Sequence, residues 1–159
     1  MGDEHLDTWS ALVAVYQSVL HDVVRALENE AGLDSGVFSA LAYLARAEPR
    51  GRMHLSELHD LMHPRYSQPG MSRLVQRMEA DGLVERRTDP DDRRATILLM
   101  TRAGRARFAR ANGVYADAVR EHFGRHLPAA EARTLERSLG TILRARATST
   151  FESRTVRAR

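Results

Sequence analysis

The sequence contains no cysteine and no lysine, and its apolar runs are short. Without cysteine the chain can form no disulfide, thiolate zinc site, iron–sulfur cluster or cysteine nucleophile. No apolar run approaches the roughly 20 residues that are needed to span a bilayer. The first residues include Asp3, Glu4 and Asp7, where a secretory signal would carry positive charge. We therefore expect a cytoplasmic protein that is not inserted in a membrane.

Short motifs that are typical of enzymes are also absent. The sequence has neither Gly-x-Ser-x-Gly nor His-Glu-x-x-His, and it has no glycine-rich loop that could cradle a phosphate. The acidic residues Asp89, Asp91 and Asp92 stand beside arginines in a predicted turn, and hairpin geometry explains them better than acid–base catalysis does. We therefore predict that the protein is not an enzyme and that it carries no cofactor.

Arginine supplies all of the basic side chains. The chain of 159 residues has 24 arginines and a formal net charge of +3. Using arginine alone can reflect a GC-rich coding bias, but the distribution of charge says more. Residues 1–62 hold 4 arginines and 10 acidic residues, whereas residues 63–110 hold 11 and 6, and residues 111–159 hold 9 and 5. A basic middle next to an acidic first third indicates a face that binds a polyanion.

Apolar residues spaced three and four apart predict helices along most of the chain. These helices cover about 7–31, 35–47, 55–63, 68–81, 102–124 and 128–147. Two β-prone runs, 83–88 and 95–100, are joined by a segment in which Pro90 suits the second position of a type I turn. We therefore expect a hairpin with a charged tip. Residues 148–159 are expected to form a frayed basic tail.

The helix predicted at 68–81 has two distinct faces. Ser67 is a good N-cap for it. Its apolar stripe consists of Met71, Leu74, Val75 and Met78. Another side carries Gly70, Arg73 and Arg77. A helix and turn before it and a hairpin after it make a winged helix-turn-helix, in which such a helix fits a DNA major groove about 12 Å wide.

The fold class that these elements predict is mainly α, in the order α-α-α-α-β-β-α-α. A winged helix-turn-helix at 34–101 is expected between an N-terminal dimerisation helix at 1–33 and two C-terminal dimerisation helices at 102–147, followed by the tail. The helices at the two ends have more apolar surface than one small winged domain could cover. That surplus favours a dimer, because unpaired apolar surface is a liability.

Three stretches of the sequence resemble a known family. They read HLSELHDLM, SQPGMSRLVQRMEADGLVERR and TDPDDRRATILLMTRAGRARF, and they lie within residues 54–108. The last is similar to the wing signature of the MarR family of bacterial transcriptional regulators, an Asp-x-Arg followed by a short strand and Leu-Thr-x-x-Gly, with Met100 in place of the leucine. The turn HPRYSQPG is about two residues longer than the common form of the helix-turn-helix.

The resemblance implies a DNA-binding regulator, most simply a repressor, and it assigns roles to residues. In the wing, Arg94 corresponds to the arginine that enters the minor groove, Asp92 orients it, and Arg93 lies near the DNA backbone. The start of the recognition helix presents Ser67, Gln68, Gly70, Ser72 and Arg73, and Arg77 is placed on a phosphate. Because arginine and glutamine can each make two hydrogen bonds to one base, Arg73 suits guanine and Gln68 suits adenine.

The family resemblance also implies a homodimer that binds a pseudo-palindromic operator. Its two recognition helices would lie one turn of DNA apart, roughly 34–36 Å. Some members of the family bind small aromatic acids between the dimer helices and the DNA-binding lobe. Trp9 and Tyr16 are therefore candidates for contacts with a small-molecule effector, although packing at the dimer interface is the simpler interpretation of Trp9.

Two alternative interpretations remain open at this point. His122 and His126 stand four residues apart, as do His59 and His63, and such a pair can bind zinc when a third ligand is supplied. A zinc-responsive regulator of the same fold is therefore one alternative, although histidines near a helix end are commonly surface residues. The other alternative is a winged-helix module for protein interaction that has no specific DNA site.

Overall fold

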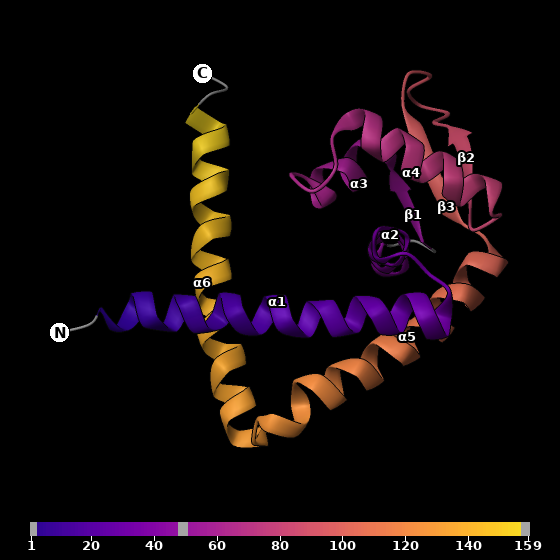
Figure 1. Cartoon of the computed structure of the whole chain (residues 1–159). Coiled ribbons are helices and arrows are strands. Elements are labelled where there is room, and N and C mark those ends of the chain that lie inside the picture. The colour runs from indigo at the N-terminus through magenta and orange to yellow at the C-terminus, as the bar shows by residue number, and fades with distance from the viewer. Residues whose placement is uncertain (1–2, 48–50, 157–159) are drawn as a thin grey trace. The chain divides into compact units, whose positions relative to one another are not determined.

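The computed structural model describes residues 3–47 and 51–156, with side chains up to residue 146. The chain forms two compact units, Met1–Val119 and Arg120–Arg159 (Figure 1). The winged helix-turn-helix predicted from the sequence lies wholly in the first unit. Within the described ranges, none of the helices combines the length and the apolarity that crossing a membrane requires.

Helix α1 (Glu4–Ala31) begins at Asp3, whose carboxylate accepts the backbone N–H of His5. It ends at Gly32, which has φ 58° and therefore adopts the left-handed conformation that a glycine after a helix allows. Its buried residues all lie in its C-terminal third: Val23, Leu27 and Ala31. The N-terminal part of α1 is exposed on most sides of the helix.

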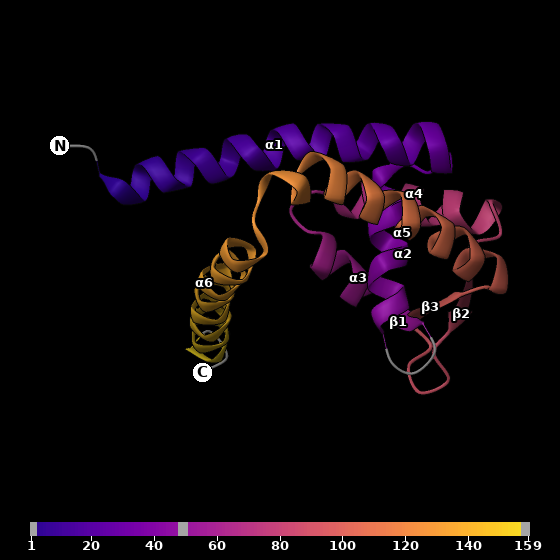
Figure 2. The same ribbon diagram turned by 90° about the horizontal axis from the view of Figure 1, so that it is seen from below.

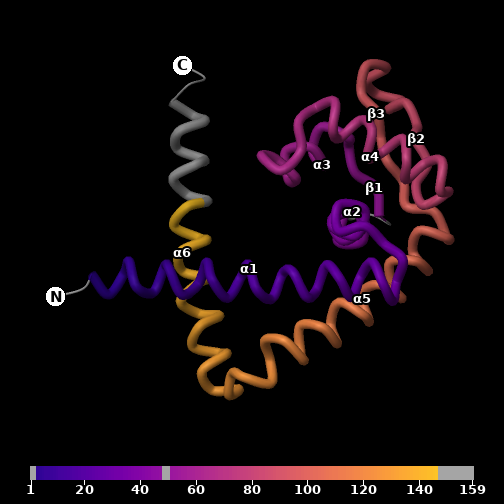
Figure 3. The backbone as a smooth tube through the Cα atoms, viewed as in Figure 1, coloured from indigo at the N-terminus to yellow at the C-terminus, as the bar shows by residue number. Residues whose placement is uncertain are grey.

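The next elements follow the predicted order closely. They are α2 (Ser35–Arg46), α3 (Leu55–Met62), α4 (Gln68–Ala80), β2 (Val84–Thr88), β3 (Thr96–Met100) and α5 (Arg102–His122). Figure 3 traces the backbone from α2 through α3 and α4 into the hairpin of β2 and β3. The winged helix-turn-helix fold predicted from the sequence is therefore confirmed.

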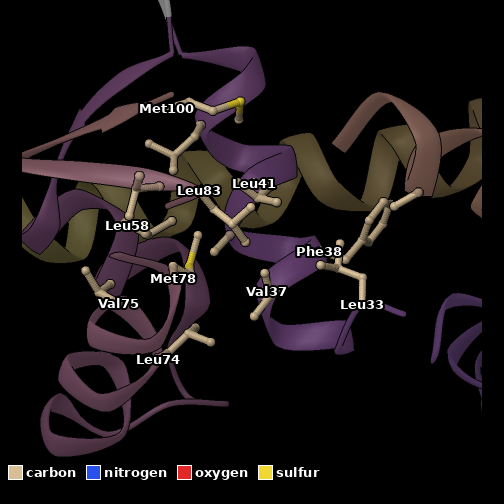
Figure 4. Packing of buried hydrophobic residues seen from close by; sticks show 14 of the residues in the cluster. Leu33, Val37, Phe38, Leu41, Leu58, Leu74, Val75, Met78, Leu83 and Met100 are labelled. Atoms are coloured by element: carbon tan, nitrogen blue, oxygen red, sulfur yellow. The ribbon is translucent and has the colours of Figure 1, made fainter. Parts of the chain in front are cut away.

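Helix α2 provides the centre of the core. Its buried side chains include Leu41 and Leu44, which are fully inaccessible to solvent. Leu58 of α3 and Met78 of α4 are equally inaccessible and belong to the same hydrophobic cluster (Figure 4). The stripe predicted on α4 is buried in full, and this burial leaves the opposite side of α4 exposed.

A short strand that the sequence analysis missed completes the sheet. Strand β1 (Arg52–His54) pairs antiparallel with β3, and the strand order is β1-β3-β2. The prediction of only two strands was therefore wrong. Three residues are too few to show the alternation of about four to eight residues by which a strand is recognised. Pairing with β3, more than 40 residues away in the sequence, stabilises β1 instead.

The C-terminal helices differ from the prediction at their ends. Helix α5 stops at His122, and a short 3₁₀ helix, Gly124–His126, follows it. Helix α6 (Ala129–Val156) continues about nine residues beyond the predicted end at 147. The expected frayed tail is therefore helical up to Val156, and residues 157–159 of it lie outside the described residues. Residues 148–156 contain neither glycine nor proline, the usual signals that end a helix.

Candidate nucleic-acid interface

Helix α4 starts with the cap that the sequence predicts. The Ser67 hydroxyl accepts the backbone N–H of Gly70 at 3.3 Å, and Pro69 occupies the first turn, where no intrahelical N–H partner is lost. The free N–H groups at this end and the positive end of the helix dipole attract anions. The structure thus gives Ser67 a role in starting the helix.

We expect Ser67→Ala to lower the free energy of unfolding by roughly 0.5–1 kcal/mol, because one backbone N–H of α4 loses its partner. Urea titration followed by circular dichroism measures this loss. Ser67→Asp is the matched control, since aspartate caps helices as well as serine does. If Ser67→Ala is as stable as the wild type and Ser67→Asp, the hydroxyl does not cap α4.

The exposed side of α4 is rich in unpaired polar groups. Gln68, Ser72 and Arg73 are all exposed. Within the part of the chain that the structure describes, their side chains make no hydrogen bond or ion pair. The Arg73 guanidinium and the Gln68 amide stand on a rigid helix, and their N–H donors are free. They are therefore suited to bind a polar ligand that has many hydrogen-bond acceptors.

The loop between β2 and β3, residues 89–95, forms the wing and extends beyond the sheet (Figures 1 and 2). Backbone hydrogen bonds from Asp89 to Ala95 and from Ala95 to Asp92 close it. The Asp92 carboxylate accepts the backbone N–H of Arg94 at 2.9 Å. Asp92 therefore orients Arg94 through the main chain of Arg94. It does not bind the Arg94 guanidinium.

Arg93 and Arg94 are exposed at the end of the wing. Among the described residues, neither guanidinium has an ion-pair or hydrogen-bond partner. Arg87, farther down on β2, differs because its guanidinium pairs with Glu85 at 2.9 Å. The unpaired positive charge of the wing is thus concentrated at its end.

Asp89 anchors the base of the wing, a role that the sequence analysis did not find. It is the buried polar residue of the described core, 6% exposed. One carboxylate oxygen accepts the backbone N–H of Asp91 at 2.9 Å, and the other lies 3.2 Å from His54 Nε2. An aspartate that opens a turn before proline is a local signal for the first bond. The second depends on β1, which the sequence did not predict.

A hollow of about 540 Å³ joins α4 to the wing. Its polar lining includes His59 of α3, Gln68 and Ser72 of α4, and Asp92 and Arg94 of the wing. The Nε2 atom of His59 is buried without a hydrogen-bond partner in the described residues. The structure therefore brings together four of the nine residues for which the sequence predicts DNA contacts, Gln68, Ser72, Asp92 and Arg94, so one extended ligand could contact both elements.

Arg77 has a different environment from the other predicted contact residues. Its Nη2 atom lies 3.2 Å from Asp34 Oδ1, at the start of α2. It lines a second hollow, of about 600 Å³, together with residues of α2 and α5 such as Val37 and Arg107. Arg77 is half exposed, so this pair leaves several of its N–H donors free.

The remaining candidates are the two aromatic residues of α1 and the four histidines. Trp9 and Tyr16 are about 60% exposed on α1, and neither lines a hollow described above. His59 and His63 approach edge to face with ring centroids 6.0 Å apart. Around these histidines and around His122 and His126, no group of three side chains suited to hold a metal is found in the described part of the chain.

The amino-acid sequence matches a family model. Residues 31–95 match the model of the MarR family, and no match is found among curated proteins. The match includes α2, β1, α3, α4, β2 and the wing.

Solved structures similar to the chain extend this likeness beyond the matched residues. AbsC, a MarR family transcriptional regulator from Streptomyces coelicolor, is 24% identical, with a TM-score of 0.78 over 93% of this chain and 97% of its own. Sco3205, a MarR family transcriptional regulator from the same organism in complex with DNA, is 26% identical, with a TM-score of 0.75 over 92% and 91%. A mutant of MarR from E. coli complexed with operator DNA is 22% identical, with a TM-score of 0.68 over 89% and 99%.

The matched residues contain α4 and the wing, so the candidate interface lies in the region that the family model covers. The fold shared with AbsC covers 93% of this chain and so also includes the long helices before and after residues 31–95. Over residues 31–95 the chain therefore matches the MarR family model, and over most of its length it has the fold of solved MarR family transcriptional regulators.

Proposed function

We propose that the protein binds a pseudo-palindromic DNA operator as a homodimer and represses transcription. The hollow shared by α4 and the wing carries this proposal, because it sets the exposed, unpaired Arg94 beside Gln68 and Ser72. Similar structures that contain DNA, those of Sco3205 and of MarR from E. coli, support it. Phosphate contacts by arginine would supply much of the affinity and would weaken steeply with salt.

Base recognition is assigned to the start of α4. Gln68 and Arg73 stand within two turns of the helix N-terminus and are exposed. Arginine can bind the two acceptors of guanine in the major groove, and glutamine can bind adenine in the corresponding way. Ser72 lies between them on the chain and can bond to a base or a phosphate. Each matched pair would discriminate against a wrong base by roughly 1–3 kcal/mol.

Arg94 is assigned to the minor groove. A narrow minor groove has a strongly negative potential that attracts arginine. The Asp92 carboxylate, by fixing the Arg94 main chain, limits the directions in which the side chain can extend. Arg93, next to it and also exposed, is positioned for the neighbouring phosphates. This arrangement would favour operators with A·T-rich flanks.

Exposed apolar side chains support the homodimer. On α1 the large ones are Leu6, Trp9, Val15 and Tyr16, which are between 45% and 63% exposed. On α6 they are Ile142 and Leu143, 57% and 68% exposed. Both helices thus present apolar surface that a monomer would leave in water. We assign Trp9 and Tyr16 to this dimer face.

A small-molecule effector would release the operator by binding one spacing of the two recognition helices better than the other. Such a ligand can shift the equilibrium only by its difference in affinity for the two states. Small aromatic acids are the class to screen first against the operator complex. If no compound class changes operator affinity, this part of the proposal is wrong.

Selection of binding sites from a random duplex DNA pool tests the proposed function. The purified protein is used at near-physiological salt, and Gln68→Ala/Arg73→Ala serves as the matched control. A two-fold symmetric motif with half-sites about ten base pairs apart is expected for the wild type. The control should lose the motif and retain salt-sensitive binding. Binding without any motif in the wild type would instead favour a protein-interaction module.

A further inference from the structure

The long turn between α3 and α4 is attached to the first turn of α2. Arg65 Nη2 donates to Ser35 Oγ at 3.3 Å. The next residue, Tyr66, is half buried, packs against the hydrophobic cluster and places its hydroxyl group against Gly36. The extra length of this turn therefore does not form a free loop, because two consecutive side chains fasten it to α2.

Gly36 is needed for this contact for reasons of space. It is buried, and a Cβ added there would collide with the Tyr66 hydroxyl and approach the Tyr66 Cζ to 2.9 Å. Its backbone is not in the left-handed region, where Gly32, Gly51 and Gly82 are found. The missing side chain thus makes room for Tyr66, and the backbone conformation would allow other residues.

The same turn of α2 also contacts the last turn of α4. Asp34 caps α2 by accepting the backbone N–H groups of Gly36 and Val37 at 2.8 and 3.1 Å. The same Oδ1 atom lies 3.2 Å from Arg77 Nη2. Residues 34–36 therefore contact the chain on both sides of the α4 N-terminus: the turn that leads into the helix, and a residue two turns farther along it.

We propose that residues 34–36 form a contact site, here called the seat, that fixes the orientation of α4 on DNA. The residues that contact this seat, Arg65, Tyr66 and Arg77, are then positioning residues for base recognition. This inference rests on the proposed DNA-binding function. The polar contacts involved are exposed, and exposed ion pairs add little stability. Their effect would be geometric, because base contacts tolerate errors of only about 0.5 Å and 10–20°.

Gly36→Ala tests the seat by displacing Tyr66. We expect affinity for the selected operator to fall about tenfold, because misplaced side chains lose base contacts. Affinity for a random duplex should stay within about twofold, since phosphate contacts carry no sequence information. A smaller folded fraction would weaken binding to both duplexes equally. The ratio of the two affinities therefore separates a positioning role from a structural one.

A double-mutant cycle assigns the effect to the contact with Tyr66. Tyr66→Phe alone should keep the ratio near that of the wild type, because the ring still fills its place. Gly36→Ala/Tyr66→Phe should recover part of the ratio, because the hydroxyl is gone and the ring carbon Cζ, 2.9 Å from the new Cβ, requires only a small shift. Gly113→Ala is the matched control, since a Cβ added there meets nothing within 4 Å. It should leave the ratio unchanged.

The outcomes distinguish this inference from the function on which it rests. If the wild type selects no motif, the proposed function fails. If the wild type selects a motif and Gly36→Ala keeps the wild-type ratio of operator affinity to random-duplex affinity, the proposed role of residues 34–36 is wrong. Should Gly36→Ala not fold, Arg65→Ala/Tyr66→Ala removes the contacts from the side of the turn, and the same loss of ratio is expected. An unchanged ratio in that variant overturns the inference equally.

Discussion

Replacing Arg94 by alanine is expected to lower operator affinity by roughly 1–3 kcal/mol for each wing of the proposed dimer. The guanidinium is exposed at the end of the wing and has no ion-pair partner among the described residues. It therefore gives up no protein contact when it enters a minor groove, and its removal costs no internal interaction. The loss should appear in fluorescence-anisotropy titrations of a labelled operator at fixed salt, since salt alone changes such affinities greatly.

Arg87→Ala is the control for charge in that experiment. It removes the same charge from the same hairpin, but its guanidinium is already paired with Glu85. We expect it to change operator affinity much less than Arg94→Ala does. Melting temperatures of all variants should agree, because exposed side chains contribute little to the core. Equal operator affinity for Arg94→Ala and the wild type would exclude the wing from the interface.

The success of the sequence analysis on α4 and the wing has a local cause. The apolar stripe of α4 repeats every three or four residues, and its cap at Ser67 is adjacent in sequence. The wing hairpin has Pro90 and three aspartates within four residues. Patterns of this kind reside in short windows, so residues in contact are also neighbours in the sequence. Four residues that line the hollow, Gln68, Ser72, Asp92 and Arg94, are among those for which the sequence predicts DNA contacts.

What the sequence analysis missed depends on contacts between distant residues. Strand β1 is defined by β3, and the anchor of Asp89 is defined by His54, 35 positions before it. The contact of Tyr66 with Gly36 spans a similar interval. A glycine in the first turn of a helix gives no local sign that a tyrosine needs its space. Only the packed structure shows why these residue types stand where they do.

The Leu-Thr-x-x-Gly part of the wing signature shows how a sequence motif acquires a physical explanation. The Thr101 hydroxyl donates to the Gly82 carbonyl at 2.6 Å and accepts the backbone N–H of Gly104 at 2.9 Å, so it caps α5 and ties it to the loop before β2. A Cβ added at Gly104 would collide with the Leu83 carbonyl oxygen. Both residues hold the start of α5 against the chain that enters the hairpin.

Gly104→Ala is therefore expected to lower the free energy of unfolding by about 1–3 kcal/mol. The colliding atom belongs to the backbone beside β2, so no flexible side chain can move aside. Gly113→Ala, the same substitution in the same helix, should instead raise the free energy of unfolding by about 0.5–1 kcal/mol, because alanine favours helix and nothing lies within 4 Å of the added Cβ.

Urea unfolding of both variants tests the opposite signs, and one protein concentration is used for both because the stability of the proposed dimer would depend on concentration. Gly104→Ala should also weaken operator binding, because the displaced Leu83 carbonyl leads directly into the strand that carries the wing. If Gly104→Ala raised the free energy of unfolding as much as Gly113→Ala does, α5 would be able to move away from Leu83. The glycine of the wing signature would then need an explanation other than close approach of the backbone.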